Sequence, residues 1–263
     1  MILFLGTGKM ASAIAGGMVK AGTDPNEIGG YDVNDSALQL FSKNTGATSF
    51  TDIKTAISSS EVIVLAVKPQ HFTSAVSGKA DLFAGKLVIS IMAGVKISSI
   101  LDIISTDRVI RVMPNTPALV GEGASAFATS YATTDADVEV AEQILSAIGK
   151  VYKVSEEQLD AVTGLSGSGP AYVFNFIQSL ADGGVRMGLT RDVALNLAAQ
   201  TVLGAAKMVV ETGEHPAVLA DQVTSPGGTT AAGLAALEDG AFRSVVSSAV
   251  KSATERSKEL GAK

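Results

Sequence analysis

The N-terminal stretch Ile2-Leu3-Phe4-Leu5-Gly6-Thr7-Gly8-Lys9-Met10-Ala11 decides the fold that we expect. Four apolar residues predict a buried strand, and Gly6-x-Gly8-x-x-Ala11 predicts a tight turn into a helix over residues 12–20. In such a turn the second glycine lets a pyrophosphate approach, and unpaired N–H groups at the start of the helix face the anion. The stretch therefore predicts the phosphate-binding end of a dinucleotide site. The alternative is a glycine turn that binds no ligand.

Short apolar runs alternate with helical patterns through the first part of the chain. Most of these runs are continuously apolar, which is typical of parallel strands covered on both faces. The predicted strands cover residues 2–5, 28–31, 62–67, 87–91, 109–113 and 125–128, and the predicted helices cover residues 36–44, 52–58, 71–82 and 98–104. This alternation favours βαβ units and a doubly wound, Rossmann-type α/β sheet.

The pattern changes at Ser155, where Ser155-x-x-Gln158 is a capping-box signature and no strand pattern follows. We predict helices over residues 156–187, 191–211, 216–223, 229–238 and 241–260, with Thr190 as an N-cap and Gly188, Gly213 and Gly240 as stops. We therefore expect a dinucleotide-binding domain over residues 1–154 and an all-helical domain over residues 155–263.

The predicted helix over residues 191–211 is apolar nearly all round, with Val193, Leu197, Leu203 and Val209 on different faces. A helix of this kind needs cover on most of its faces. We therefore expect a homodimer built on the C-terminal helices.

Composition excludes several classes of protein. The chain is 46% hydrophobic and 17% charged, which is inconsistent with disorder. Cysteine is absent, so no disulfide or thiolate chemistry is possible, and a reducing cytoplasm fits. A net charge of −6 without a basic cluster argues against nucleic acid, and His71 and His215 are too far apart to suggest a metal site. No uninterrupted apolar run approaches the roughly 20 residues of a membrane span.

Asp32 follows the second predicted strand, where a carboxylate accepts hydrogen bonds from the adenosine ribose in NAD-binding proteins. A 2′-phosphate would be repelled by roughly 3 kcal/mol per unit charge at about 5 Å and an effective dielectric of 20. No Arg follows to offset this repulsion. The position therefore favours NADH, unless Asp32 only caps the next helix.

Three further loops follow predicted strands, at the edge of the sheet where ligands bind. The loop Ala66-Val67-Lys68-Pro69 holds Lys68 extended before a proline, and Met92-Ala93-Gly94 leaves room for a nicotinamide ring. The segment Arg111-Val-Met-Pro-Asn115-Thr-Pro117 presents an amide between two prolines. The alternatives are a solvated lysine, an ordinary loop glycine and a plain rigid turn.

The C-terminal half contains two small-residue motifs. Ser166-Gly-Ser-Gly-Pro-Ala171 favours close helix packing, with an indirect role in shaping the site. Thr224-Ser225-Pro-Gly227-Gly228-Thr229-Thr230 is a glycine turn that opens onto a predicted helix, so its N–H groups suit a substrate carboxylate. The alternative for the second motif is a helix cap without a ligand.

These motifs, taken in order, resemble those of pyrroline-5-carboxylate reductases. The resemblance runs from residue 1 to about residue 260, and its most specific segments are Gly164-Leu-Ser-Gly-Ser-Gly-Pro-Ala-Tyr172 and Val223-Thr-Ser-Pro-Gly-Gly-Thr-Thr230. It implies reduction of a cyclic imino acid, L-1-pyrroline-5-carboxylate, to L-proline with NADPH or NADH, the last step of proline biosynthesis. It also implies a Rossmann domain and an interlocking helical dimer, which some members assemble into decamers.

The resemblance assigns residues to both sites. Part of the substrate site would come from the second protomer, and Thr230 would hydrogen-bond the ring nitrogen. The implied cofactor contacts are Leu5, Gly6, Thr7, Gly8, Lys9, Met10, Ala66, Val67, Lys68, Pro69, Met92, Ala93 and Gly94, and the implied substrate residues are Glu156, Gln222, Thr229 and Thr230.

Two positions depart from the family pattern. Gln222 stands where other members can carry Asn, and Asp32 departs from those members that have an Asn-Arg type pair for the 2′-phosphate. The sequence offers no obvious general acid, so the proton comes from solvent or the substrate binds as an iminium ion.

Two rival functions remain at this point. A hydroxyacid dehydrogenase shares the two-domain plan but needs a catalytic lysine, for which Lys207 is the internal candidate on its helix. A non-catalytic dinucleotide- or pyridoxal-phosphate-binding protein would not need the second anion-binding turn at residues 225–230.

Overall fold

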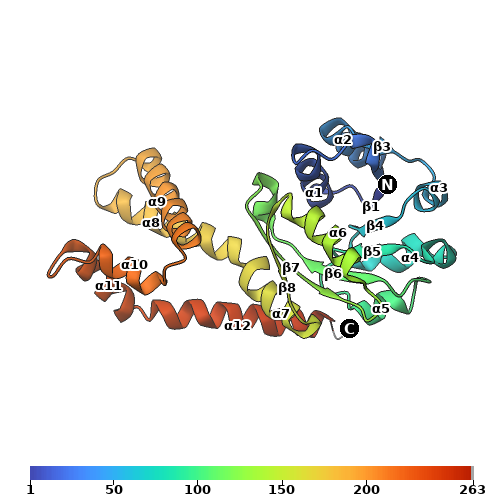
Figure 1. Cartoon of the computed structure of the whole chain (residues 1–263). Coiled ribbons are helices and arrows are strands. Elements are labelled where there is room, and N and C mark those ends of the chain that lie inside the picture. Colours follow the sequence, from blue (N-terminus) through green and yellow to red (C-terminus); the bar gives the residue numbers. More distant parts are fainter. Residues whose placement is uncertain (262–263) are drawn as a thin grey trace. The chain divides into compact units, whose positions relative to one another are not determined.

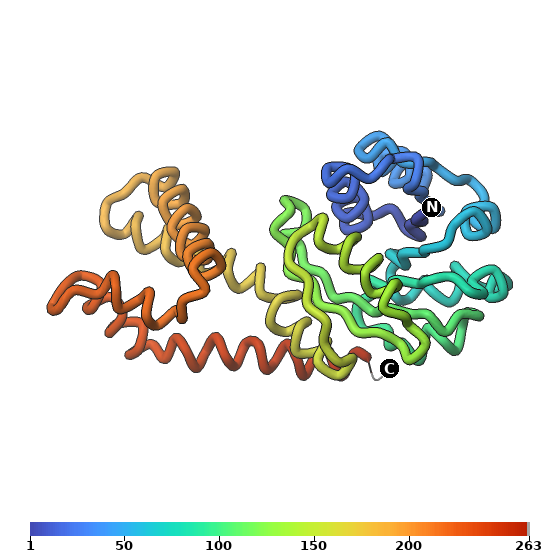
Figure 2. Tube along the Cα trace, in the orientation of Figure 1, coloured from blue at the N-terminus to red at the C-terminus, as the bar shows by residue number. Residues whose placement is uncertain are grey.

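The computed structural model describes residues 1–261 (Figure 1). Their contacts divide them into two compact units, one of Met1–Ser168 together with residues 252–261, and one of Gly169–Lys251. The long last helix, α12 (Phe242–Gly261), begins in the second unit and ends in the first (Figure 2). The domain boundary that we expect after Val154 stays a prediction.

The first unit is built on one eight-stranded sheet in the order β3-β2-β1-β4-β5-β6-β7-β8. The strands from β3 through β6 are parallel, β7 runs antiparallel to β6, and β8 is parallel to β7. The strands are β1 (Ile2–Leu5), β2 (Ile28–Tyr31), β3 (Thr48–Ser49), β4 (Val62–Leu65), β5 (Leu87–Ser90), β6 (Val109–Met113), β7 (Gly123–Thr129) and β8 (Gly149–Lys153). The doubly wound Rossmann-type sheet that the sequence predicts is confirmed.

Helices cover both faces of this sheet, as the continuously apolar strands require. Residues of α1, α2 and α6 pack on one face, and residues of α3, α4, α5 and α7 pack on the other. Their bounds are α1 (Lys9–Lys20), α2 (Asp35–Thr45), α3 (Ile53–Ser58), α4 (Phe72–Val76), α5 (Ile97–Leu101), α6 (Asp135–Ser146) and α7 (Leu159–Val162).

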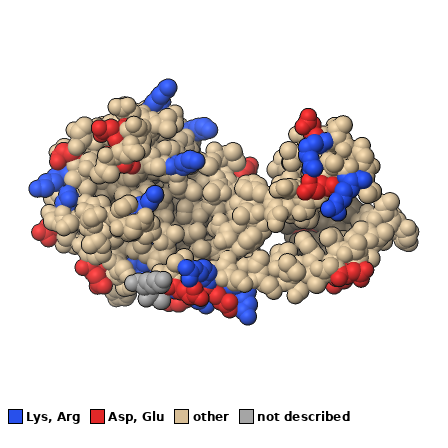
Figure 3. Space-filling model, turned by 180° about the vertical axis from the view of Figure 1, so that it is seen from behind, with Lys and Arg blue, Asp and Glu red and all other residues tan. Residues whose placement is uncertain are grey.

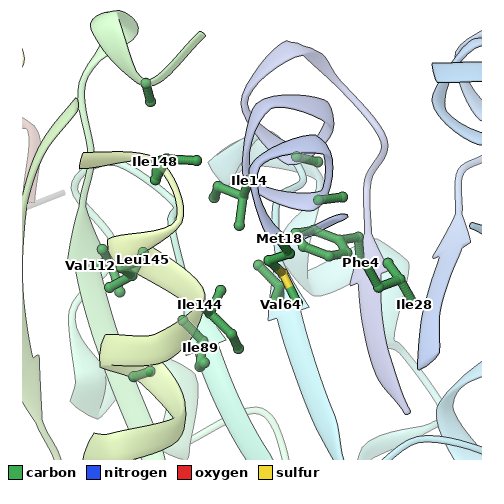
Figure 4. Close-up of a cluster of buried hydrophobic side chains, with 14 of the residues drawn as sticks. Phe4, Ile14, Met18, Ile28, Val64, Ile89, Val112, Ile144, Leu145 and Ile148 are labelled. Atoms are coloured by element: carbon green, nitrogen blue, oxygen red, sulfur yellow. The ribbon is translucent and has the colours of Figure 1, made fainter. Parts of the chain in front are cut away.

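The core on the α1 side is shown in Figure 4. Phe4 of β1 is fully buried there, and its ring centroid lies 5.7 Å from that of Phe41. Ile14 and Met18 point from α1 toward the sheet, and Ile144 and Leu145 do so from α6. Because alternate residues of a strand face opposite ways, Leu3 and Leu5 belong to the core on the other face.

Several predicted elements of the first unit are wrong. The helix expected over residues 71–82 is only α4, because Gly78 adopts φ +66° and the chain then enters the 3₁₀ turn Ala80–Phe83. The helix expected over residues 98–104 is the shorter α5. Three elements were not predicted at all, namely β3, α6 and β8. Helix α6 begins with a capping box of Thr134 and Asp137, a local signal that marks its start.

The second unit is entirely helical. It contains α8 (Gly169–Arg186), α9 (Arg191–Thr212), α10 (Pro216–Gln222), α11 (Thr229–Asp239) and the first part of α12. Helices α8 and α9 pack through small residues, since Ala181, Ala194 and Ala198 form their buried cluster. Most large apolar side chains of this unit are exposed, including Leu197, Leu203 and Val210 of α9.

The single helix expected over residues 156–187 is also wrong. A 3₁₀ turn (Glu156–Gln158), α7 and a π turn (Thr163–Gly167) precede α8. The predicted capping box at Ser155 is confirmed, although it opens the 3₁₀ turn. The other C-terminal helices are confirmed within two residues, and Gly188 and Gly213 adopt positive φ where the helices stop.

Candidate active site

The turn after β1 has a conformation that only glycine tolerates well. Gly6 adopts φ +93°, and a Cβ there would lie 2.7 Å from the carbonyl carbon and oxygen of Ala66. The Gly6 N–H donates to Tyr31 O at 2.9 Å. The turn is therefore held between the ends of β2 and β4, at the carboxyl edge of the sheet.

Helix α1 begins directly after this turn, and its N-terminus has no side-chain cap. Its N-cap is Gly8, which has no side chain to cap the helix, and a Cβ at Gly8 would meet nothing within 4 Å. The first N–H groups of a helix have no intrahelical acceptor. Open space and free donors together fit the pyrophosphate of a dinucleotide. Lys9 and Met10 occupy the first two helical positions.

Asp32 is fixed by hydrogen bonds to the same turn. Its Oδ2 accepts from Thr7 N at 2.8 Å and from Thr7 Oγ1 at 3.1 Å, and its Oδ1 accepts from Asn34 N at 2.9 Å. The N-cap of α2 is Asn34, whose side chain accepts from Ala37 N at 3.2 Å. The alternative role of Asp32 as a helix cap is therefore wrong. The sequence reasoning also missed that Asp32 holds the glycine turn in place.

A cavity of about 550 Å³ extends from this turn over the ends of β2 and β4. Seven of the fifteen predicted cofactor residues line it, together with Val33 and Asn34, which follow Asp32. Lys68 is exposed and extended at its rim (φ −65°, ψ 139°), directly before the 3₁₀ turn that Pro69 begins. The predicted residues lining the cavity are Leu5, Gly6, Gly8, Asp32, Ala66, Val67 and Lys68. Its shape and position suit the adenosine half of a dinucleotide.

The loop after β5 lies beside a second cavity, of about 400 Å³. Met92 is buried, Ala93 is exposed, and Gly94 adopts φ +76°. Gly94 and Glu156 both line this cavity, together with Arg111. Charged side chains of both signs also gather at the C-terminal end of α12 (Figure 3), from which Lys258 reaches the same cavity.

Asn115 is engaged inside the protein. Its Oδ1 accepts from Ala124 N at 2.9 Å, and its Nδ2 donates to Ser166 O at 3.1 Å. The side chain therefore ties the loop after β6 to β7 and to the π turn. One amide N–H remains, so a contact between Asn115 and the cofactor stays a prediction.

The predicted substrate loop lies in the second unit. Gly227 adopts φ +68°, and a Cβ on Gly228 would lie 2.2 Å from Ser225 Oγ, so the loop needs both glycines. Gly228 is the N-cap of α11 and provides no side-chain cap, which leaves the first N–H groups of α11, at Thr229 and Thr230, open to an anion.

Gln222 has a partner that the sequence reasoning missed. Its Nε2 donates to Glu214 Oε2 at 3.0 Å. Both side chains are exposed at the two ends of α10. The bond uses one amide N–H of Gln222 and leaves its carbonyl oxygen and its second N–H for a ligand.

Lys207, the candidate of the rival dehydrogenase, lies on the surface of α9. Its Nζ lies 3.5 Å from Glu211 Oε1, and both side chains are more than half exposed. This is an ordinary i,i+4 ion pair of a solvated helix face. The described residues 1–261 also contain no group of three or more His, Cys, Asp or Glu placed to hold a metal.

An uncapped phosphate turn with a carboxylate beside it, on a Rossmann-type sheet followed by a helical unit, defines a nicotinamide-dependent oxidoreductase of two domains. Comparison with known families agrees. Residues 1–94 match a family described as "NADP oxidoreductase coenzyme F420-dependent", and residues 156–260 match "Pyrroline-5-carboxylate reductase dimerisation".

Proteins that are similar to this chain over its whole length identify the particular family. A pyrroline-5-carboxylate reductase of Arabidopsis thaliana is 47% identical over 98% of this chain and 94% of its own. A solved reductase of Coxiella burnetii has a TM-score of 0.94 at 36% identity, covering 98% of this chain and 97% of that one. A reductase of Plasmodium falciparum with NADP bound has a TM-score of 0.87 at 34% identity, covering 99% and 97%. The chain belongs to the pyrroline-5-carboxylate reductase family.

Proposed function

We propose that this chain reduces L-1-pyrroline-5-carboxylate to L-proline as the last step of proline biosynthesis in the cytoplasm, with NADH as its preferred reductant. The observation that carries the proposal is a pair of uncapped helix N-termini in one chain of this family. Helix α1 suits the pyrophosphate of the cofactor, and α11 suits the carboxylate of the imino acid.

The residues of the substrate loop bind and orient the imino acid. The N–H groups of Thr229 and Thr230 hold its carboxylate, and the Thr230 hydroxyl hydrogen-bonds the ring nitrogen. The bound nicotinamide supplies the hydride. Hydride transfer depends mainly on the alignment of donor and acceptor. The contribution of the chain is therefore to hold the C=N carbon of the substrate against the nicotinamide and to prevent other orientations of the substrate. The proton on nitrogen comes from solvent or arrives with an iminium substrate.

Thr230 gives the first test. We expect Thr230→Ala to lower kcat/KM for the imino acid by about 100-fold, since orientation at the reacting carbon is lost. Thr230→Ser keeps the hydroxyl and should retain most of the activity. The measurement is oxidation of NADH and NADPH followed at 340 nm. Full activity in Thr230→Ala would contradict the role of this residue.

The preference for NADH rests on the fixed carboxylate of Asp32. Its bonds to Thr7 and Asn34 hold the negative charge at the cavity where a 2′-phosphate would lie, and Val33 beside it is 88% exposed. The Plasmodium falciparum relative binds NADP, so the preference is a property we propose for this chain and not for the family.

Val33 allows a test that leaves the turn intact. Val33→Arg places a cation beside the 2′-phosphate, and we expect kcat/KM with NADPH relative to NADH to rise about tenfold or more. Val33→Gln, which adds length without charge, should leave the ratio near that of the parent chain. Equal or better kcat/KM with NADPH in the parent chain would contradict the proposed preference.

We also propose that the chain is a homodimer, on which larger assemblies such as decamers can be built, and that α9 lies in the interface. Among residues 1–261, α9 is the helix that is long and apolar enough to cross a membrane, by length and composition, and only 11% of its apolar window is buried. The match to a dimerisation family over residues 156–260 supports a protein partner instead of lipid as its cover.

A further inference from the structure

The loop that we place under the nicotinamide ring is anchored at its far end by one carboxylate oxygen. Glu156 Oε1 accepts from Ile97 N at 2.7 Å, and Ile97 is the first residue after the loop 92–96. At the near end, Ile91 N donates to Leu65 O at 3.0 Å and Met92 is buried. Val95 lies between these two anchors and packs against the core, and Glu156 is the polar anchor at the far end of the loop.

Glu156 is itself held by a charge that is almost fully buried. Arg111 Nη1 lies 3.1 Å from the same Oε1, and the Arg111 side chain is 8% exposed, against 29% for Glu156. Arg111 comes from the middle of β6, in register with Ser90 of β5. The guanidinium therefore stands on the rigid sheet, and Glu156 connects it to the loop.

We propose that Arg111 and Glu156 are a positioning pair that fixes the loop Met92–Gly94 against the nicotinamide end of the cofactor. In this arrangement both donors engage Oε1 of Glu156, and Glu156 acts on the cofactor through the loop. The inference rests on the proposed placement of the nicotinamide at this loop.

Both partners of the pair are needed. Without Glu156, Ile97 N loses its acceptor and Arg111 is left buried without the one carboxylate that contacts it among residues 1–261. A buried guanidinium without its anion draws in water or moves outward. The cavity that Gly94, Arg111 and Glu156 share gives both room to shift. The loop Met92–Gly94 is then no longer held at a fixed distance from the proposed nicotinamide site.

The test measures separately the binding of the whole dinucleotide and the binding of its half without nicotinamide. In Glu156→Ala we expect the Kd for NADH to rise about tenfold, and the Kd for ADP-ribose, which lacks the nicotinamide, to stay within about twofold. Glu156→Gln keeps an acceptor for Ile97 N and should fall between the parent and Glu156→Ala. The KM for the imino acid at saturating NADH should change by less than about threefold.

Glu157 provides the matched control. It lies next to Glu156 on the same 3₁₀ turn and lines the same cavity, but no hydrogen bond or ion pair to Arg111 is found for it among residues 1–261. Glu157→Gln removes the same charge and should leave the binding of NADH and ADP-ribose unchanged.

Other outcomes would overturn the inference. A raised KM for the imino acid with unchanged NADH binding would make Glu156 a substrate ligand. Parallel loss of NADH and ADP-ribose binding would make the pair a general structural support. If Glu156→Ala fails to fold, the ratio of the two Kd values in Glu156→Gln decides. Failure of the parent chain to bind NADH would instead refute the proposed cofactor site.

Discussion

At the scale of single residues, Arg108 and Asp137 form a partly buried ion pair in the first unit. Arg108 Nε donates to Asp137 Oδ2 at 3.0 Å, Nη2 donates to Oδ1, and Asp137 is 3% exposed. Thr134 N adds a further bond at 2.9 Å. The hydrogen bond from Arg108 lowers the pKa of Asp137 from 3.8 to about 2.

This pKa gives a prediction for stability against pH. A carboxylate whose pKa is depressed in the folded state contributes stability above its unfolded pKa and loses it as the pH falls through the folded value. We expect Asp137→Asn to cost about 2 kcal/mol of unfolding free energy at pH 7. The difference from the parent chain should shrink between about pH 4 and pH 2. Urea unfolding at several pH values measures it.

Asp135 is the control for this prediction, because it lies in the first turn of the same helix and is exposed. Asp135→Asn should cost less than about 1 kcal/mol, through the helix dipole alone. A pH-independent difference between the parent chain and Asp137→Asn would show that the ion pair does not carry the effect.

At the scale of elements, the start of α11 shows how a helix becomes a binding site. Gly228 has no side chain to cap the helix, and it cannot carry one without displacing Ser225, whose Oγ would lie 2.2 Å from the new Cβ. The first N–H groups of α11 are therefore left for a ligand. Gly8 likewise leaves α1 without a side-chain cap, and Gly6 forms the tight turn before it.

A comparison of the N-cap Gly228 with Gly233 inside α11 tests whether the start of this helix binds the substrate. Gly228→Ala pushes Ser225 and the loop out of place, and we expect kcat/KM for the imino acid to fall about tenfold or more, mainly through KM. Gly233 lies inside the same helix, and a Cβ there meets nothing within 4 Å. Gly233→Ala should keep activity and raise stability by about 0.5–1 kcal/mol. Equal kinetics in both variants would contradict the role of the loop.

At the scale of the whole molecule, the exposed apolar surface of α9 requires cover. Leu197 is 56% exposed, Leu203 is 58% and Val210 is 68%. We expect Leu203→Glu to shift the dimer toward monomer and to lower activity with it, because a charge would be buried in the interface. Light scattering during size-exclusion chromatography gives the mass, and the 340 nm assay gives the activity.

Lys207 serves as the control on the same helix. Its pairing with Glu211 is exposed, so Lys207→Ala should keep both the dimer and the turnover. Loss of turnover in Lys207→Ala with an intact dimer would instead support the rival dehydrogenase. An unchanged dimer in Leu203→Glu would place the interface elsewhere.

The sequence by itself determined the features that depend on local pattern. Continuous apolar runs identified most strands of the sheet, and positive-φ glycines marked the phosphate turn and two helix ends, because these conformations exclude most other residues. The family followed from the order of the motifs. The helix predicted over residues 71–82 was wrong, because the helical pattern there did not reveal that the helix breaks before Gly78.

Only the tertiary structure decided which polar groups meet. Asp32 contacts Thr7 across 25 positions of sequence, Arg111 contacts Glu156 across 45, and Glu156 contacts Ile97 N across 59. Such contacts depend on which strands lie side by side and on which face each side chain leaves the sheet. Local propensity carries no information about either, and so the contacts of Asp32 and Glu156 follow only from the way the strands are arranged.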